Sequence, residues 1–324
     1  MRSLAALALA TALHLPHGYD AHVYATGLTH PTAFAFRAGG GGLFVTEDTG
    51  RLVVIPRGGH RPRLVARGLG VPLGLVWLDR SHLVVSTQGK LLRLTIGRGG
   101  RATQTQRLVT HLPYGEHQQD NIVSFHGRLY VGSGSTCDAC VERDSRSAAV
   151  LSLKPDGTGI RVVARGLRNP YGLVVDRRRD RILVSVNGRD DLGNRADPEP
   201  AEMVVQLGRG RNFGWPRCWP SARLLELVGK CRGVTPPVAY LEPHSSADGM
   251  AFWRGTLYVA EWGQYDSHRF GRRIVRVRLN GPMRSRVSVF ASGFDHPLAL
   301  AVDPLGALLV ADWGRGVVYR ITGG

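Results

Sequence analysis

Lysine is scarce in this chain, and its scarcity shapes the whole charge distribution. Only Lys90, Lys154 and Lys230 contribute to the 42 basic residues, so nearly all of the positive charge comes from arginine. The net charge is +17, yet the arginines are spread along all 324 residues, with one short run at residues 177–179. Nucleic-acid-binding proteins usually gather basic charge on one face or element. The spread therefore argues against specific nucleic-acid binding and predicts only weak attraction to anionic surfaces.

Long apolar runs and helical periodicity are also missing. Beyond residue 12 no stretch of 18 apolar residues occurs, and no long segment places apolar residues at helical spacing. These absences exclude a membrane-spanning helix and a helical bundle. Glycine is plentiful instead, at 42 residues, and an apolar content of 43% is sufficient for a large core. The composition therefore favours a turn-rich β architecture.

Cysteine is limited to Cys137, Cys140, Cys218 and Cys231. The first pair, in the tetrapeptide Cys-Asp-Ala-Cys, is similar to half a zinc site, but no second such pair follows and no histidine pair has ligand spacing. A haem-attachment motif needs histidine after the second cysteine, where this chain has Val141. We therefore predict two local disulfides in an oxidising compartment, Cys137–Cys140 and Cys218–Cys231. A free dithiol at the first pair is the alternative.

The first twelve residues are typical of an export signal. Arg2 precedes an apolar stretch at residues 4–12 that ends in Ala-Thr-Ala, a small-x-small cleavage pattern. We predict a signal peptide or a disordered N-terminus over residues 1–12, and hence a secreted or periplasmic protein. The alternative is a short first helix of the domain.

From residue 13 onward the chain repeats one unit six times. The unit opens with a motif such as Gly-Leu-x-x-Pro and continues with three short apolar strands separated by polar turns. The opening proline moves from Pro31 to Pro72, a step of 41 residues. A period of about 40–50 residues with several strands per unit is typical of β-propellers. We therefore predict an all-β fold, a single six-bladed β-propeller over residues 13–324, in preference to two separate sandwiches.

Copies three, four and five contain long insertions, and insertions on one face of a closed repeat usually form its site. His117 precedes an inner strand, where a neutral imidazole can accept a proton. Arg168 begins the next inner strand, so its planar guanidinium is expected to face the central channel and suits a carboxylate. Gly188 and the aspartates at 190–191 offer carbonyl and carboxylate oxygens, which Ca²⁺ prefers, although an Asx-rich turn has the same composition. The aromatic loop 212–220 can stack on a flat cofactor or a sugar, or pack beneath its own chain.

These segments, in this order, resemble the PQQ-dependent sugar dehydrogenases of the glucose/sorbosone dehydrogenase family. The resemblance runs from about residue 15 to residue 321 and is most specific at residues 168–173, 187–193 and 212–216. It implies a six-bladed propeller that oxidises a sugar or polyol hydroxyl by passing a hydride to PQQ, which Ca²⁺ holds over the central channel. Because the chain has no haem motif, the electrons are expected to leave to an external acceptor.

The resemblance also implies roles for single residues. His117 is similar to the family's catalytic base, which takes the proton of the sugar hydroxyl. The residues expected to bind the cofactor are Arg168, Asn169, His244 and Arg273. The residues expected to bind Ca²⁺ are Gly188 and Arg189, through backbone carbonyls, and Asp190.

The chain departs from the family pattern in two places. The last blade begins with His296-Pro297 where many relatives have Arg-Pro, and residues 118–120 lack a basic residue that some relatives have. PQQ carries several carboxylates, so each missing cation is expected to weaken its binding. Two other functions therefore stay open, a binding propeller that has lost PQQ and a metal-dependent lactonase-type propeller. The lactonase would need metal ligands on the channel axis, for which the candidates are Glu47, Asp120, Asn121, Asn187 and Asp248.

Overall fold

The computed structural model describes residues 13–37, 42–190 and 199–324. The signal peptide predicted over residues 1–12 lies outside the described residues, as does Asp191. In the described part, helical structure is limited to one 3-10 turn, η1 (Met283–Ser285). None of the described helices is long and apolar enough to cross a membrane.

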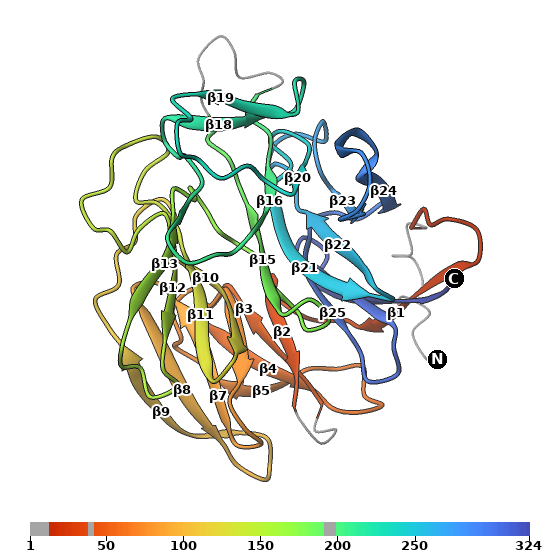
Figure 1. The fold of residues 1–324 in the computed structure, drawn as a ribbon. Helices are drawn as coiled ribbons and strands as arrows, with labels where there is room; N and C mark the ends of the chain where they lie inside the picture. The colour runs from red at the N-terminus through yellow and green to blue at the C-terminus, as the bar shows by residue number, and fades with distance from the viewer. Residues whose placement is uncertain (1–12, 38–41, 191–198) are drawn as a thin grey trace.

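Six antiparallel sheets radiate from a central channel, as the sequence repeat predicted (Figure 1). Blade 1 contains β2 (Pro31–Phe36), β3 (Leu43–Glu47), β4 (Arg51–Ile55) and β5 (Arg63–Ala66). Blade 2 contains β6 (Gly74–Trp77), β7 (His82–Thr87), β8 (Lys90–Ile96) and β9 (Ala102–Val109). Blade 3 contains β10 (Gln119–Phe125), β11 (Arg128–Ser133), β12 (Ala149–Leu153) and β13 (Arg161–Arg165), with the short β17 (Arg211–Asn212) paired parallel to β13.

The remaining blades follow the same order from the channel outward. Blade 4 contains β14 (Leu173–Asp176), β15 (Arg181–Val186), β16 (Met203–Gln206) and β20 (Ala239–Tyr240). Its insertion forms a separate hairpin of β18 (Cys218–Ser221) and β19 (Glu226–Gly229). Blade 5 contains β21 (Ala247–Trp253), β22 (Thr256–Glu261), β23 (Arg273–Val277) and β24 (Val287–Ser292). Blade 6 contains β25 (Pro297–Val302), β26 (Leu308–Asp312), β27 (Val317–Gly323) and β1 (Tyr19–Ala25).

Each blade thus has a fourth, outer strand that the three-strand repeat unit did not include. The outer strand of blade 2 is polar because it lies at the rim: β9 reads ATQTQRLV, and most of its side chains are exposed. The outer strand of blade 6 is β1, from the opposite end of the chain, which pairs antiparallel with β27 from Tyr19↔Gly323 to Ala25↔Val318. This pairing closes the ring, because it joins a strand near the start of the described chain to the last strand (Figure 1).

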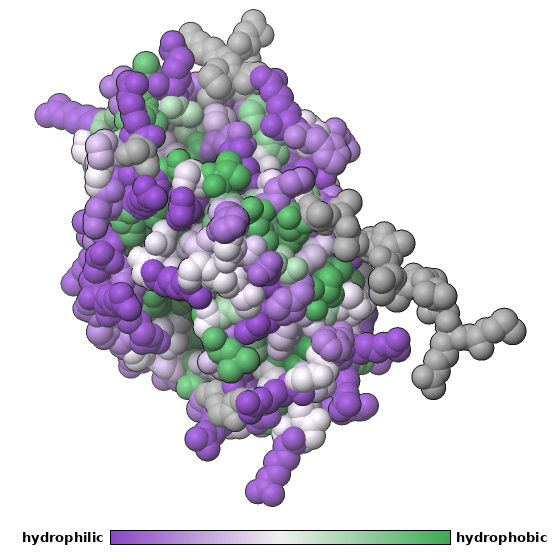
Figure 2. All heavy atoms as spheres, turned by 90° about the vertical axis from the view of Figure 1, so that its right-hand side faces the viewer, coloured by the Kyte–Doolittle hydropathy of each residue, from purple (hydrophilic) through white to green (hydrophobic). Residues whose placement is uncertain are grey.

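The hydrophobic core lies between blades rather than in one centre. Six clusters each combine residues of two consecutive blades; one, for example, packs Phe44 and Leu52 of blade 1 against Leu83 and Leu94 of blade 2. Middle strands are therefore buried on both faces, which explains why they read as continuous apolar runs. Most of the face seen in Figure 2 is hydrophilic, with hydrophobic atoms in small separate patches.

The inner strands approach one another closely around the channel. The Thr32 hydroxyl donates to the Pro72 carbonyl at 2.6 Å, and the Ser185 hydroxyl donates to the Asp248 carbonyl at 2.6 Å, so both bonds join neighbouring blades. A Cβ on Gly249 would lie 2.3 Å from the Leu298 carbonyl oxygen, so glycine is required there. Because strands alternate in direction, the loops that precede inner strands and the loops between second and third strands share one end of the channel. The insertions between β11 and β12 and between β22 and β23 lie at this end.

Candidate active site

A cavity of about 550 Å³ occupies the loop end of the central channel. Its volume lies within the range of about 300–1,000 Å³ that is usual for small-molecule and cofactor sites. Residues from all six blades line it. We distinguish two groups among the lining residues: the polar wall, from blades 3 and 4, and the aromatic wall, from blades 5 and 6. The polar wall consists of Glu116, His117, Arg168, Asn169, Asn187, Asp190 and Glu202. The aromatic wall consists of Trp262, Tyr265, Leu298 and Trp313.

His117 lies on the polar wall, in the loop that leads into β10. Its Nδ1 lies 3.0 Å from the Ser135 hydroxyl oxygen and 3.3 Å from the Ser135 carbonyl oxygen. A carbonyl can only accept, and the Ser135 hydroxyl already donates to the Cys137 carbonyl at 2.7 Å, so the imidazole proton belongs on Nδ1. Nε2 is left with its lone pair. Burial, and then the positive charge of Arg168, lower the pKa of His117 to about 4, so the ring is neutral at pH 7 and able to accept a proton.

The position of His117 depends on a neighbouring glycine. A Cβ on Gly134 would lie 2.3 Å from the His117 Cβ and 3.0 Å from the Asn169 side-chain oxygen. Even an alanine at position 134 therefore cannot be accommodated without displacing one of these two predicted site residues.

Arg168 and Asn169 also lie on the polar wall, just before β14. The Arg168 Nη2 contacts Asp190 Oδ2 at 2.5 Å and Asp138 Oδ1 at 2.9 Å, and the residue is 5% exposed. Its guanidinium is thus held in a fixed direction by two carboxylates. Asn169 is buried, and its side-chain oxygen has no hydrogen-bond partner among the described residues. A buried amide oxygen without a partner is costly, so it is a natural contact for a bound group.

The predicted metal segment adjoins the same wall. The Gly188 N–H donates to the Glu202 carboxylate, and the Asp190 N–H donates to Asp138 Oδ1 at 2.9 Å. Burial raises the pKa of Glu202 to about 8, against the lowering effect of the Gly188 N–H. Asp190 lines the cavity, whereas Gly188 and Arg189 line a small hollow beside it. The carboxylates of Asp190 and Glu202 therefore line the cavity, and the backbone of Gly188 and Arg189 lies in the hollow beside it.

The two remaining predicted cofactor residues, His244 and Arg273, lie in different surroundings. His244 lines the cavity and has a φ of 57°, a left-handed conformation that costs roughly 1 kcal/mol for a residue with a side chain. Arg273 is not among the lining residues. Its guanidinium pairs with Glu261 at 2.6 Å and with Glu242 at 2.8 Å. The structure therefore brings His117, Arg168, Asn169, Asp190 and His244 around one cavity, and ties Arg273 to its own acidic partners.

The aromatic wall is a part of the site that sequence reasoning did not assign. Trp262 and Tyr265 follow β22, and Trp313 follows β26. The centroid of the Trp262 ring lies 4.6 Å from that of Tyr265 and 5.6 Å from that of Trp313, and both pairs meet edge to face. His296, which stands where many relatives have arginine, packs against Trp262 at 4.1 Å. The Trp313 Nε1 donates to Asp48 at 3.1 Å. The run Trp262-Gly263-Gln264-Tyr265 in an insertion was the available signal.

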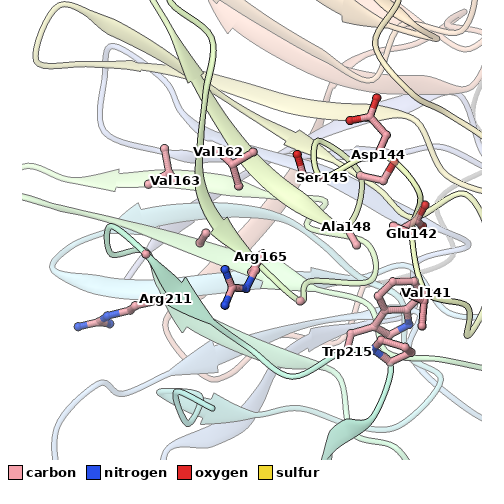
Figure 3. Close-up of a pocket in the computed structure, with 15 residues that line it drawn as sticks. Val141, Glu142, Asp144, Ser145, Ala148, Val162, Val163, Arg165, Arg211 and Trp215 are labelled. Carbon is pink, nitrogen blue, oxygen red and sulfur yellow. The ribbon is translucent and has the colours of Figure 1, made fainter. Parts of the chain in front are cut away.

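The aromatic loop 212–220 lies elsewhere. Trp215 lines a separate, open groove of about 390 Å³ on the outer side of blade 3, where it stands beside Val141, with Arg165 and Arg211 farther along (Figure 3). Trp219 and Pro220 line the small hollow next to Gly188. The aromatic rings of the central cavity are therefore those of the aromatic wall and not those of this loop.

The candidate lactonase ligands are only partly gathered. Asn187 and Asp248 line the cavity, and the Asn187 amide donates to Asp248 at 3.0 Å. Burial raises the pKa of Asp248 to about 8. Glu47, Asp120 and Asn121 are not among the lining residues.

Both predicted disulfides are present, Cys137–Cys140 and Cys218–Cys231. The potential ligand atoms of Cys137, Cys140 and Glu142 lie within 4.8 Å of one another. Among the described residues, this is the group of three His, Cys, Asp or Glu side chains close enough together to hold a metal ion. A disulfide leaves no thiolate for a metal, so we assign these residues no metal.

Comparison with known proteins places this geometry in context. No known family model matches the chain. An uncharacterized protein of Borreliella burgdorferi is 20% identical over 98% of this chain and 93% of its own length. Among solved structures, the calcium structure of a Trichoderma reesei protein of Carbohydrate-Active Enzymes Family AA12 has a TM-score of 0.85 at 18% identity and covers 97% of each chain.

Two further solved structures have the same fold. The holo PQQ domain of pyranose dehydrogenase from Coprinopsis cinerea has a TM-score of 0.82 at 20% identity, over 96% of this chain and 97% of that chain. A putative oxidoreductase (glucose dehydrogenase) from Thermus thermophilus has a TM-score of 0.76 at 24% identity, over 94% of this chain and 100% of that chain. A putative gluconolactonase is less similar, with a TM-score of 0.59 at 15% identity. The resemblance seen in the sequence is thus confirmed in the fold: the chain has the six-bladed propeller of these glucose and pyranose dehydrogenase structures.

Proposed function

We propose that this protein is a quinoprotein dehydrogenase that oxidises a sugar or polyol hydroxyl, with PQQ and Ca²⁺ in the central cavity. One observation supports the proposal above all others: a neutral histidine with a free Nε2 faces the same cavity as a fixed arginine. Proton acceptance beside a positive charge is what alcohol oxidation by hydride transfer demands of a protein. The solved structures of the same fold include a PQQ domain and a calcium form.

The residues of the cavity and of the hollow beside it suit a metal ion together with a flat cofactor. Asp190, Glu202 and the carbonyls of Gly188 and Arg189 are hard oxygen donors of the kind that Ca²⁺ takes. Arg168 and the unpartnered Asn169 oxygen are suited to the polar edge of PQQ, and the aromatic wall to its ring faces. Arg273 does not line the cavity and His296 stands in place of arginine, so the charge complementarity for the cofactor carboxylates would come from the metal and from Arg168, whose own charge is partly balanced by Asp138 and Asp190.

The chain's own side chains then have distinct tasks. The His117 Nε2 accepts the proton of the substrate hydroxyl, while Nδ1–H stays bonded to Ser135. Arg168, held by Asp138 and Asp190, keeps a positive charge fixed where negative charge develops. The aromatic wall excludes water from one side. PQQ supplies the hydride acceptor when bound.

The route of the electrons and the location of the protein belong to the same proposal. The sequence contains no haem-attachment motif, so the electrons pass to an external acceptor. Two disulfides and the predicted signal at residues 1–12 fit a secreted or periplasmic protein.

The test is a titration of the purified apo-protein with PQQ, with and without Ca²⁺, followed by absorbance and then by aldose-driven dye reduction. We expect Ca²⁺-dependent binding at micromolar PQQ and dye reduction with at least one sugar or polyol. Absence of PQQ binding would overturn the proposal. Metal-dependent lactone hydrolysis in its place would favour the lactonase function, and neither activity would favour a binding propeller.

A further inference from the structure

The loop between β11 and β12 contacts both chemical groups of the polar wall. It contains Ser135 and the tetrapeptide closed by the Cys137–Cys140 disulfide. The loop is partly exposed. Val141, which follows the tetrapeptide within the loop, is 67% exposed and lines the open groove on the outer side of blade 3 (Figure 3). Few apolar contacts hold such a segment, so its backbone position depends on hydrogen bonds and on the covalent bridge.

On one side the loop orients the base. Ser135 presents its hydroxyl and its carbonyl to the His117 Nδ1 at 3.0 and 3.3 Å. The hydroxyl proton is in turn directed away from the imidazole, because it is donated to the Cys137 carbonyl at 2.7 Å. The position of the Cys137 carbonyl therefore decides which way the Ser135 hydroxyl points, and so which nitrogen of His117 carries the proton.

On the other side the loop holds the arginine. Asp138 accepts from Arg168 Nη2 and from the Asp190 N–H through one carboxylate oxygen, both at 2.9 Å. The Asp138 carbonyl accepts from Arg168 Nε at 3.3 Å and from the Trp215 indole at 2.9 Å. Four donors thus converge on one residue of the disulfide-closed tetrapeptide.

We propose that the loop closed by the Cys137–Cys140 disulfide is a positioning device, in which Ser135 sets the tautomer of His117 and Asp138 sets the direction of Arg168. The inference rests on the proposed dehydrogenase function for its catalytic consequence, but its structural claim concerns the cofactor-free protein. Ser135 and Asp138 are positioning residues, because they act through His117 and Arg168. The disulfide fixes the carbonyls of Cys137 and Asp138 in position relative to His117 and Arg168.

The first arm of the test reads the tautomer of His117 in the apo-protein by ¹⁵N NMR of the imidazole at pH 7. We expect the wild type to show one species with Nδ1 protonated. Ser135→Ala removes the nearer acceptor and leaves the carbonyl at 3.3 Å, so the Nε2-protonated form should appear beside it. Ser147→Ala is the matched control, since Ser147 is also buried, lies farther along the same loop, and its hydroxyl has no partner among the described residues.

The second arm compares two variants, each of which lacks one of the two disulfides. In the Cys137→Ser/Cys140→Ser variant we expect the His117 tautomers to mix as in Ser135→Ala. The Cys218→Ser/Cys231→Ser variant is expected to keep the wild-type tautomer. Its bridge spans a sequence separation of 13 residues against 3 for the first, so it should lose more thermal stability. A change of tautomer in the variant that is destabilised less cannot come from general unfolding.

The third arm measures turnover of the PQQ-loaded protein. Ser135→Ala should lower kcat about tenfold with little change in KM, and Ser135→Thr, which keeps a hydroxyl, should recover most of it. If Ser135→Ala and the Cys137/Cys140 variant both keep the wild-type tautomer and kcat, the inference is wrong while the proposed function stands. If no variant, the wild type included, reduces the dye, the tautomer result still decides the positioning claim.

Discussion

The two walls of the central cavity are built in different ways. The polar wall is held by directional bonds: His117 to Ser135, Arg168 to Asp138 and Asp190, and Gly188 to Glu202. The aromatic wall is held by ring packing between Trp262, Tyr265 and Trp313. Side chains held by a few directional bonds lose their geometry when one partner is removed, whereas packed rings share their contacts among several neighbours.

This difference separates chemistry from binding. The polar wall contains the proposed proton acceptor and the arginine held by two carboxylates, so changes there should act mainly on kcat. The aromatic wall offers area and shape, so changes there should act mainly on KM. The following predictions test that division, from the largest expected effect to the smallest.

Removal of the base should have the largest effect. His117→Ala is expected to lower kcat about 10²–10⁴-fold, the usual contribution of a general base, and to leave PQQ affinity almost unchanged. Steady-state dye reduction and an absorbance titration measure the two quantities. His126→Ala is the control, because His126 is exposed and bonds to Asp180 away from the cavity. A His117→Ala protein as active as this control would remove His117 from the mechanism.

Displacement of the base should come next. Gly134→Ala places a Cβ against His117 and Asn169, and a misplacement of about 1 Å is expected to lower kcat by up to about a hundredfold. Gly99→Ala is the control, since no atom lies within 4 Å of its added Cβ. Wild-type turnover in Gly134→Ala would mean that the base tolerates movement and that the polar wall is less rigid than we describe.

The affinity for Ca²⁺ should depend on pH. Burial raises the pKa of Glu202 to about 8, so this carboxyl is protonated at pH 7 in the metal-free protein. A cation binds the ionised form, so its binding releases the proton and its affinity rises with pH until the carboxyl is ionised without it. We expect about a tenfold gain per pH unit below pH 8, measured by calorimetry. An affinity that stays constant from pH 6 to pH 8 would show that Glu202 does not bind the metal.

The aromatic wall should give the smallest effect. Tyr265 is 73% exposed and meets Trp262 edge-on, so Tyr265→Ala should cost binding without cost in stability. An aromatic contact of about 0.5–1.5 kcal/mol corresponds to a KM raised about 2–12-fold at unchanged kcat. Tyr114→Ala, at another exposed tyrosine outside the cavity lining, is the control. A fall in kcat at constant KM would contradict the expectation that the aromatic wall acts on binding and the polar wall on chemistry.

The sequence predicted the blades because their inner and middle strands are apolar and repeat with a recognisable opening motif. It did not predict the outer strands, since β9 is as polar as a loop, nor that β1 completes the last blade. The polar wall was largely predictable, because His117, Arg168 and Asp190 stand next to inner or second strands of successive repeats.

Contacts between distant segments were not predictable in the same way. Arg273 lies directly opposite Glu261 in the β22–β23 pair, and only the strand register reveals that its charge is used there. Trp262 and Trp313 belong to different blades, so nothing local indicates that their rings meet. Ser135 was hidden because only the β10–β11 register, which pairs Gln119 with Ser133, places it opposite His117.

The pH dependence of kcat/KM of the wild-type protein tests most directly whether a neutral His117 is the base. Burial and the charge of Arg168 lower the pKa of His117 to about 4, so the base form persists from pH 8 down to about pH 5. We predict a profile with no acid limb across that range and a decline only as the pH falls through about 4. A decline centred near pH 6.5, about the value of an unperturbed histidine, would contradict the account of the polar wall.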